Sequence, residues 1–117
     1  MQTLNFLNPL FKKGLNYTVR LGDKWRGINI NEFVWIGATG KGKSINAVAQ
    51  IQKVIYCRLA EIPQEVLNNE HDADCHHWQG LLNAMKDAYP DYFKDKDGEI
   101  IENTLVTCLG FYIYHKE

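Results

Sequence analysis

Long apolar runs and paired cysteine motifs are both missing from this 117-residue chain. No stretch of about 18 apolar residues occurs, which predicts that no helix crosses a membrane. The sequence contains no basic segment followed by an apolar one, the pattern that would predict a secretory leader. Cys57, Cys75 and Cys108 are an odd number of widely spaced cysteines, a pattern that favours reduced thiols over a disulfide framework. We therefore expect a cytoplasmic protein that makes no membrane contact.

Acidic residues are scarce in the first half of the chain, and basic residues are scarce in the second. Residues 1–58 contain nine Lys or Arg and two acidic residues, whereas residues 59–117 contain four basic and twelve acidic ones. The net charges of the two halves are +7 and −8. Such an asymmetry indicates a surface that binds a polyanion, although charges also simply keep a small domain soluble.

Alternating and apolar segments predict the strands. Residues 3–7 and 16–21 alternate between polar and apolar types, and residues 33–36 and 104–114 are apolar, β-branched or aromatic, as is typical of strands. Residues 44–57 fit a strand or a helix, because Ala and Gln favour a helix while the Ile, Val and Tyr near the end favour a strand. The order of elements favours an α+β fold, with a small mixed or closed β-sheet and appended helices.

Prolines and one apolar stripe predict the helices. We expect a helical turn at 9–13, a short helix at 63–69 that begins at its proline, and the longest helix at 75–89. Asp74 is the expected N-cap of the longest helix, and Pro90 is expected to end it. Residues 91–103 are charged and contain a glycine, which predicts a surface loop.

The predicted strand at 16–21 has one polar face, and this face carries the first candidate ligand-binding side chains. They are Asn16, Thr18 and Arg20, whose polar groups would be left unpaired in a core. After a turn, Lys24 and Trp25 extend the candidate surface, since a base can stack on the indole while a cation contacts phosphate. A Trp that covers one end of the sheet explains the same residue equally well. Trp35 and Trp78 lie in apolar patterns and are expected in the core.

Residues 37–44 read GATGKGKS and match the phosphate-loop pattern GxxxxGK[ST]. In such a loop Lys43 would reach the terminal phosphates and Ser44 would hold magnesium. The pattern requires a following helix and a parallel strand that supplies an acidic residue, and no later apolar strand ends in Asp. We therefore favour a hairpin tip, with a phosphate-loop nucleotide binder as an alternative.

Residues 70–77, EHDADCHH, concentrate side chains that can bind metals. His71 and Cys75 are four residues apart and would share one face of a helix. Structural zinc sites usually need ligands in two recognisable pairs, and the sequence contains no second cluster. Acidic residues at the positive end of a helix dipole explain the composition without a metal. We expect neither a metal nor a cofactor.

Several loose motifs occur in an order that resembles the ASCH family, a branch of the PUA-like β-barrels. They are TLNFLNPLF, GLNYTVRLGDKW, EIP at 61–63, NNEHDAD, GLLNAMKDAYP and LVTCLGFYI. The resemblance spans nearly the whole chain, with 91–103 as the main apparent insertion. It implies a single domain, residues 1–117, built as a small mixed β-barrel with flanking helices, and it assigns 44–57 to a barrel strand.

The resemblance also implies a cleft lined by the Thr-x-Arg strand that carries Thr18 and Arg20, and a single-stranded RNA or modified nucleoside as its ligand. One branch of the family removes acetyl groups from acetylcytidine with a Lys and a Thr on this strand and an acid before the long helix. In that reading Thr18 is the nucleophile, and Glu70 or Asp74 is the acid–base group. Leu15 stands where the Lys is expected. We therefore expect a binding module, with an amidohydrolase as the alternative; the oligomeric state does not follow from the sequence.

Overall fold

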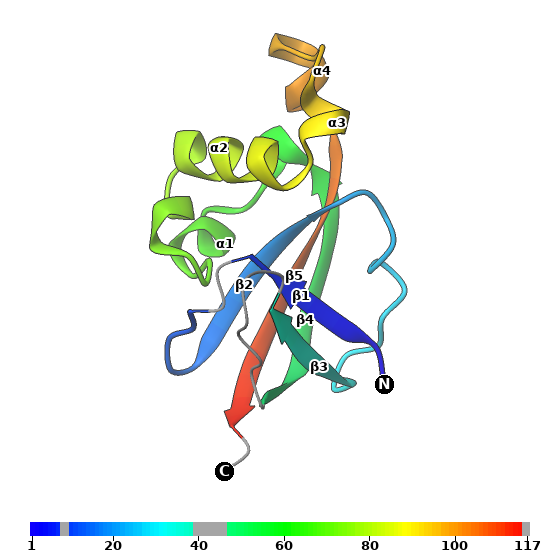
Figure 1. Cartoon of the computed structure of the whole chain (residues 1–117), viewed down its shortest axis with the longest axis vertical. Coiled ribbons are helices and arrows are strands. Elements are labelled where there is room, and N and C mark those ends of the chain that lie inside the picture. The colour runs from blue at the N-terminus through cyan, green and yellow to red at the C-terminus, as the bar shows by residue number, and fades with distance from the viewer. Residues whose placement is uncertain (8–9, 39–46, 116–117) are drawn as a thin grey trace.

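Five strands form one mixed sheet in the order β1-β3-β4-β5-β2 (Figure 1). The strands are β1 (Thr3–Phe6), β2 (Leu15–Leu21), β3 (Phe33–Ala38), β4 (Ala47–Arg58) and β5 (Leu105–His115). This arrangement comes from a computed structural model that describes residues 1–7, 10–38 and 47–115. β1 pairs with β3 in parallel, and the other pairs are antiparallel. The predicted strands are thus confirmed, including the ambiguous one from residue 47 onwards.

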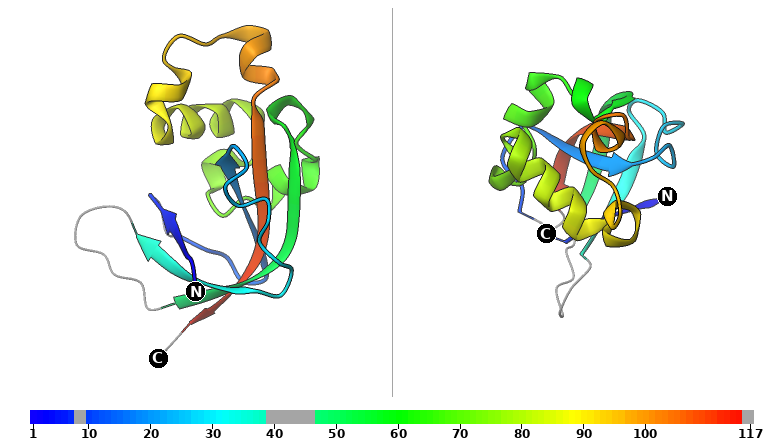
Figure 2. Two further views of the ribbon diagram at one scale, coloured as in Figure 1. Left: turned by 90° about the vertical axis from the view of Figure 1, so that its right-hand side faces the viewer. Right: turned by 90° about the horizontal axis from the view of Figure 1, so that it is seen from above.

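β4 and β5 form the long centre of the sheet. They pair from Ala47 opposite His115 to Arg58 opposite Leu105, with one irregularity between Ile51 and Lys53. An extra residue in one strand bends that strand and increases its twist. Figure 2 shows both strands curving along their length. The helices gather at one end of this curved ribbon.

The sheet is open, so the predicted closed barrel is wrong. Within the described residues no ladder joins the edge strands β1 and β2. The backbone of β2 pairs with a connecting segment instead: Tyr17 N donates to Asn69 O at 2.8 Å, and His71 N donates to Tyr17 O at 2.9 Å. Because this segment uses the edge groups of β2, β1 cannot pair there.

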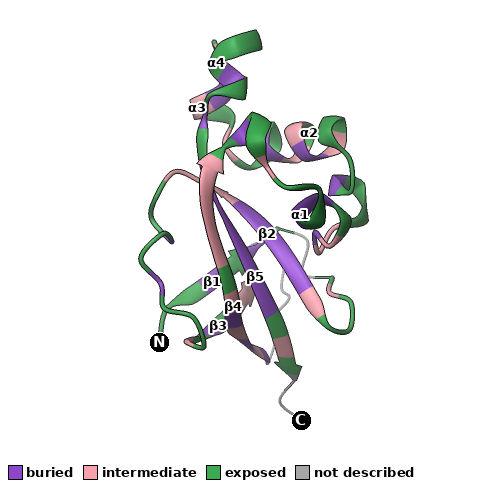
Figure 3. Cartoon of the chain, turned by 180° about the vertical axis from the view of Figure 1, so that it is seen from behind, coloured by how far each residue is buried: buried purple, intermediate pink, exposed green. Residues whose placement is uncertain are grey.

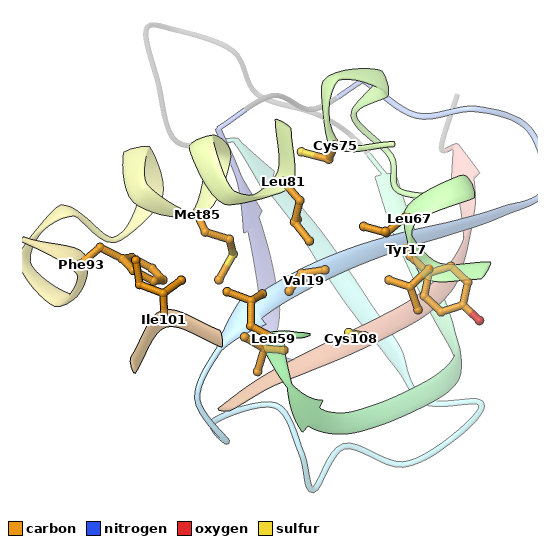
Figure 4. Close-up of a cluster of buried hydrophobic side chains, with 12 residues drawn as sticks. Tyr17, Val19, Leu59, Leu67, Cys75, Leu81, Met85, Phe93, Ile101 and Cys108 are labelled. Atoms are coloured by element: carbon orange, nitrogen blue, oxygen red, sulfur yellow. The ribbon is translucent and has the colours of Figure 1, made fainter. Parts of the chain in front are cut away.

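Two clusters of buried side chains lie on the two faces of the sheet. Successive residues of a strand point to opposite faces, and β5 alternates accordingly. Val106 and Cys108 belong to one cluster, and Leu109 and Phe111 to the other. Figure 4 shows the first cluster, to which α2 contributes Leu81 and Met85 of its apolar stripe. β5 is therefore buried on both faces at its centre, which explains its nearly continuous apolar sequence.

Short helices replace the surface loop that was predicted for residues 91–103. The helical elements are η1 (Leu59–Glu61), α1 (Gln64–Asn68), η2 (Ala73–Cys75), α2 (Trp78–Ala88), α3 (Pro90–Phe93) and α4 (Gly98–Glu102). Phe93 and Ile101 are 5% exposed and join the first cluster. Their burial offsets the cost of ordering this charged segment. None of the helices in the described ranges is long and apolar enough to cross a membrane.

The longest helix begins later than predicted. α2 starts at Trp78, and its N-cap is His77, whose Nδ1 accepts a hydrogen bond from Gly80 N at 3.2 Å. Asp74 lies in η2, where Asp72 is the capping residue and accepts from Asp74 N at 3.0 Å. The expected N-cap role of Asp74 is therefore wrong, because a separate turn precedes the helix.

Trp35 and Trp78, which were predicted in the core, are exposed, whereas Trp25 is buried, in agreement with its structural alternative. Trp25 is 6% exposed and packs in the second cluster, whereas Trp35 and Trp78 are 41% and 36% exposed. Trp35 points outward because the strand alternates, with Val34 and Ile36 buried on either side of it. A short apolar run on a strand therefore need not be buried on both faces.

Two expectations fall on residues that are described in part. Residues 10–13, the described part of the predicted helical turn, contain no helix. Most of the GATGKGKS motif lies in 39–46, outside the described residues. β3 and β4, before and after the motif, are antiparallel neighbours. A phosphate loop requires a helix after it, and the segment that follows from Ala47 is a strand.

Gly110 lies on β5 against the fully buried ring of Tyr17. A Cβ added at Gly110 would come within 2.9 Å of Tyr17 Cε1. We expect Gly110→Ala to lower the free energy of unfolding by about 1–3 kcal/mol, as overpacking usually does. Urea denaturation measures this change. Gly27→Ala is the control, since nothing lies within 4 Å of its added Cβ, and equal losses in both variants would contradict the prediction.

Candidate functional site

A cavity of about 380 Å³ lies at the seam between the edge strands β1 and β2, which do not pair with each other. We call it the seam cavity. β1 contributes Phe6, β2 contributes Thr18 and Arg20, and the segment before α2 contributes Glu70 and His71. The helix side of the wall is mostly apolar and consists of Leu81, Ala84, Met85, Ala88 and Tyr89. The other lining residues are Asn5, Leu7, Val19, Asp72 and Cys75. Its volume falls in the range of about 300–1,000 Å³ that is typical of small-molecule sites.

A wider hollow of about 710 Å³ lies near the junction of β4 with the short helices. Tyr56, Tyr92 and Ile100 form part of its wall, and its carboxylates, Asp23 and Glu99, are exposed. The wall of the seam cavity instead contains a buried carboxylate, Glu70, and a half-buried guanidinium, Arg20. Charged groups withdrawn from water mark functional sites more often than exposed ones do, so the seam cavity is the candidate site.

Arg20 is the principal hydrogen-bond donor of the seam cavity. Its Nε donates to Thr18 Oγ1 at 3.1 Å, and its Cζ lies 4.6 Å from the centroid of the Phe6 ring. Burial lowers the pKa of Arg20, while Tyr89 and Glu70 act in the opposite direction. An arginine remains charged at neutral pH even so. Its terminal nitrogens make no hydrogen bond within the described residues, so they can donate to a ligand.

Glu70 and His71 form a pair in the wall of the same cavity. Glu70 is 3% exposed, and its Oε1 contacts His71 Nδ1 and accepts from Asp72 N at 3.2 Å. His71 Nδ1 also lies 3.4 Å from Tyr17 O. Both partners of Nδ1 are acceptors, so Nδ1 carries the proton of the neutral ring and Nε2 keeps a lone pair. His71 thus offers an acceptor, and Arg20 offers donors.

Backbone pairing puts Glu70 in this position. The segment around Glu70 runs parallel to β2 and forms a bridge with Tyr17. His76 Nε2 lies 2.9 Å from Glu70 O, and the His71 ring packs edge-on against Phe6 with 4.8 Å between centroids. These contacts hold the carboxylate in place by local geometry as well as by charge.

Three of the predicted site residues come together, and four do not. Thr18, Arg20 and Glu70 line the seam cavity. The residues outside its wall are Asn16, Lys24, Trp25 and Asp74. Lys24 and Asp74 are exposed elsewhere on the surface.

Asn16 and Trp25 have structural contacts. Asn16 is fully buried, and its amide group accepts from Lys12 N at 3.1 Å and donates to Lys12 O at 3.0 Å. These bonds fix the chain before β2. Trp25 lies in the core with Lys24 Nζ 5.7 Å from its ring centroid, and a base could stack on this indole only if the ring left the core.

Sequence reasoning missed the roles of Phe6 and His71 in the cavity. His71 belongs to the ligand-rich segment at 70–77, but its direction depends on pairing with β2, which is distant in sequence. Phe6 reads as an ordinary core residue because its strand alternates. The nearby Glu70 carboxylate was the available signal, since carboxylates commonly orient histidines.

Metal binding and cysteine nucleophilicity find little support in the cavity wall. Within the described ranges, no group of three or more His, Cys, Asp or Glu is placed to hold a metal ion. His71 and Cys75 do line the same cavity. Burial, together with Glu70 and two nearby aspartates, raises the pKa of Cys75 to about 12. Cys75 is therefore a neutral thiol at physiological pH, which makes it a poor nucleophile.

Comparison with known proteins identifies the fold. No protein-family model and no curated protein matches the sequence. Among solved structures, an ASCH domain from Lactobacillus crispatus is similar, with a TM-score of 0.59 and 11% sequence identity. The match covers 86% of this chain and 65% of that one. This chain has an ASCH-domain fold. The resemblance seen in the sequence is thus confirmed for the fold, although this chain spans less than two thirds of that structure.

The tautomer of His71 tests the geometry of the site without any ligand. We expect long-range ¹H–¹⁵N correlation spectra above neutral pH to show the proton on Nδ1, because both groups that face this atom are acceptors. In Glu70→Leu, which removes the nearer acceptor, the Nε2–H tautomer should gain population. An Nε2–H tautomer in the unmodified protein would contradict the arrangement, and His77, which lies on another element, serves as the internal reference.

Proposed function

We propose that this chain is a binding module for single-stranded RNA or a modified nucleoside, and that the seam cavity holds one nucleoside of the ligand. The observation that carries the proposal is the guanidinium of Arg20, whose terminal donors are uncommitted within the described residues and face a cavity of nucleoside-sized volume. The ASCH-domain fold supports the same class of ligand.

The walls of the cavity suit a base that has both donors and acceptors on its edge. Ala84, Ala88 and Tyr89, which are at least partly exposed, offer apolar contact to a flat ring. Arg20 donates to a carbonyl, ring nitrogen or phosphate oxygen, and such charge-assisted bonds are strong in a site that excludes water. The Glu70 carboxylate and His71 Nε2 accept from an amino or imino group. A nucleoside meets all of these demands at once.

The charge distribution supports a polyanionic ligand outside the cavity. The half of the chain that contains β1 to β4 has a net charge of +7. Lys24 is exposed and free to approach a phosphate, which gives it a role distinct from that of Arg20. Such contacts add affinity that falls with salt and carry no base preference.

Arg20→Ala tests the role of the cavity. We expect it to weaken binding of a nucleoside roughly ten- to a hundredfold, because a charged hydrogen-bond donor contributes about 1.5–3 kcal/mol. Isothermal titration calorimetry with cytidine, N4-acetylcytidine, uridine, adenosine and guanosine measures the change. Lys24→Ala is the matched control. It should leave nucleoside binding unchanged and reduce only the salt dependence of binding to single-stranded RNA.

The proposal fails if the folded protein binds none of these nucleosides and no single-stranded RNA. It also fails if Arg20→Ala and Lys24→Ala lose affinity equally. Circular dichroism establishes that each variant is folded. Arg20→Lys keeps the charge but not the planar donor geometry, so partial retention of binding in this variant would assign the role of Arg20 to charge alone.

The amidohydrolase alternative has two of its three predicted catalytic residues in the seam cavity. Thr18 and Glu70 line the same cavity, but Asp74 is exposed outside it. The described wall contains no lysine, and Thr18 Oγ1 already accepts a hydrogen bond from Arg20. A hydroxyl nucleophile needs an adjacent base to activate it. We therefore infer that the cavity binds a nucleoside without cleaving it.

Incubation with N4-acetylcytidine separates binding from hydrolysis. We expect no cytidine above the level formed in buffer, as measured by liquid chromatography over many hours at near-neutral pH. Turnover that disappears in both Thr18→Val and Glu70→Gln, while each variant remains folded, would establish the hydrolase in place of the binding module.

A further inference from the structure

Four aromatic side chains lie exposed on one face of the sheet. We call Phe33, Trp35, Tyr112 and Tyr114 the aromatic face, and their exposures are 43%, 41%, 39% and 48%. Phe33 and Trp35 come from β3, and the two tyrosines come from β5. Figure 3 shows exposed and partly exposed bands at this end of β5. The aromatic face is separate from the seam cavity, whose wall contains none of its residues.

Strand register brings these rings together. Gln50 on β4 pairs with Phe33 on one side and with Tyr112 on the other, and Val48 likewise pairs with Trp35 and Tyr114. Directly paired residues point to the same face of a sheet. The four rings therefore flank a central strand in two successive rows.

Hydrogen bonds and ring contacts hold part of the aromatic face in one arrangement. Tyr114 Oη donates to Gln50 Oε1 at 3.2 Å, and Gln50 Nε2 donates to Asn31 O at 3.3 Å. The rings of Phe33 and Tyr114 are 6.0 Å apart, centroid to centroid. Rings that are already positioned lose little conformational entropy when a ligand binds.

Positive charge lies at the border of this face. Within the described residues, the paired positions of the face carry no charged side chain. Lys12 and Lys13 are exposed and come just before Leu15, which is the β2 neighbour of Tyr112. Lys12 Nζ donates to Asn69 Oδ1 at 2.5 Å. On β4, Lys53 follows the central residues and is paired with Glu65 at 3.3 Å.

The charge of the border argues against a second copy of the chain as the occupant. A two-fold symmetric dimer places the same patch of both subunits together, so lysines at one border would approach lysines at the other. A polyanion with flat groups complements both parts of the surface. Its bases can stack on the rings, and its phosphates can approach the lysines.

We propose that the aromatic face is a stacking platform for bases of a single-stranded nucleic acid. Stacking on aromatic rings tolerates any base, because each base has a π-face, and sheets that expose aromatic side chains are known to bind RNA in this manner. This platform is independent of the nucleoside proposed for the seam cavity. It predicts that a short oligonucleotide binds even when Arg20 is removed.

Fluorescence anisotropy with a fluorescein-labelled single-stranded oligouridylate tests the platform. We expect the double variant Phe33→Leu/Tyr114→Leu to bind at least tenfold more weakly, because loss of a stacking ring costs about 1–3 kcal/mol per base. Leucine keeps the surface apolar but removes the π-face. Trp78→Leu is the matched control, since Trp78 is exposed on α2 and is not part of the aromatic face, and the affinity of this variant should not change.

Further variants separate this proposal from the others. Phe33→Tyr and Tyr114→Phe retain the rings and should retain affinity, while Arg20→Ala should still bind the oligouridylate. The proposal is overturned if the unmodified protein does not bind it, or if the folded double leucine variant binds equally well. A concentration-dependent dimer in light scattering that excludes the oligonucleotide would assign the face to a second copy and overturn the proposal as well.

Discussion

Two backbone hydrogen bonds to Tyr17 determine where the sheet ends and where the seam cavity begins. They tie the segment at 69–71 to the edge of β2. Edge strands expose unpaired N–H and C=O groups that recruit another strand, and here a connecting segment takes that place. The seam stays open as a result, and the same pairing brings Glu70 and His71 in from a distant part of the sequence. Fold and site thus share one cause: the segment at 69–71 takes the edge of β2 that a closed barrel would pair with β1, and this segment forms part of the cavity wall.

The cost of this arrangement lies in its buried charges. Withdrawing a carboxylate or a guanidinium from water is unfavourable unless hydrogen bonds and opposite charge compensate for it. Glu70 receives hydrogen bonds from His71 and Asp72 N, whereas Arg20 makes one hydrogen bond, from its Nε to Thr18 Oγ1, and lies over the face of Phe6. The direction of the shift in the pKa of Arg20 reflects this imbalance, since burial outweighs its neighbours. An incompletely compensated cation facing a cavity is more useful for binding than for stability.

Local pattern predicted the strands but not the way in which they meet. The alternation at 16–21 correctly separated the Tyr17 side from the Thr18 side, because a strand has a fixed period of two. The open seam and the position of Glu70 depend on pairing between segments that are distant in sequence. The periodicity of a single segment cannot predict such pairing. Residues 91–103 read as a loop because their charges dominate, although Phe93 and Ile101 are enough to anchor two short helices. The wrong prediction for Trp35 has the same origin, since burial there is decided by which face the rest of the chain covers.

One irregularity in β4 connects the two proposed surfaces. The structure places an extra residue, Gln52, between Ile51 and Lys53. Gln50 before the bulge and Lys53 after it consequently lie on the same face, because one pairs with Tyr112 and the other with Gly110, and these two residues share one face of β5. Past the bulge this face is covered by helices, and before it the face carries exposed aromatic rings. Bulges bend and twist a strand, so one long ribbon can present a core to the helices at one end and a free aromatic surface at the other. The exposed rings are therefore a consequence of how far the helices reach, and they leave an apolar surface that a ligand with flat groups can cover.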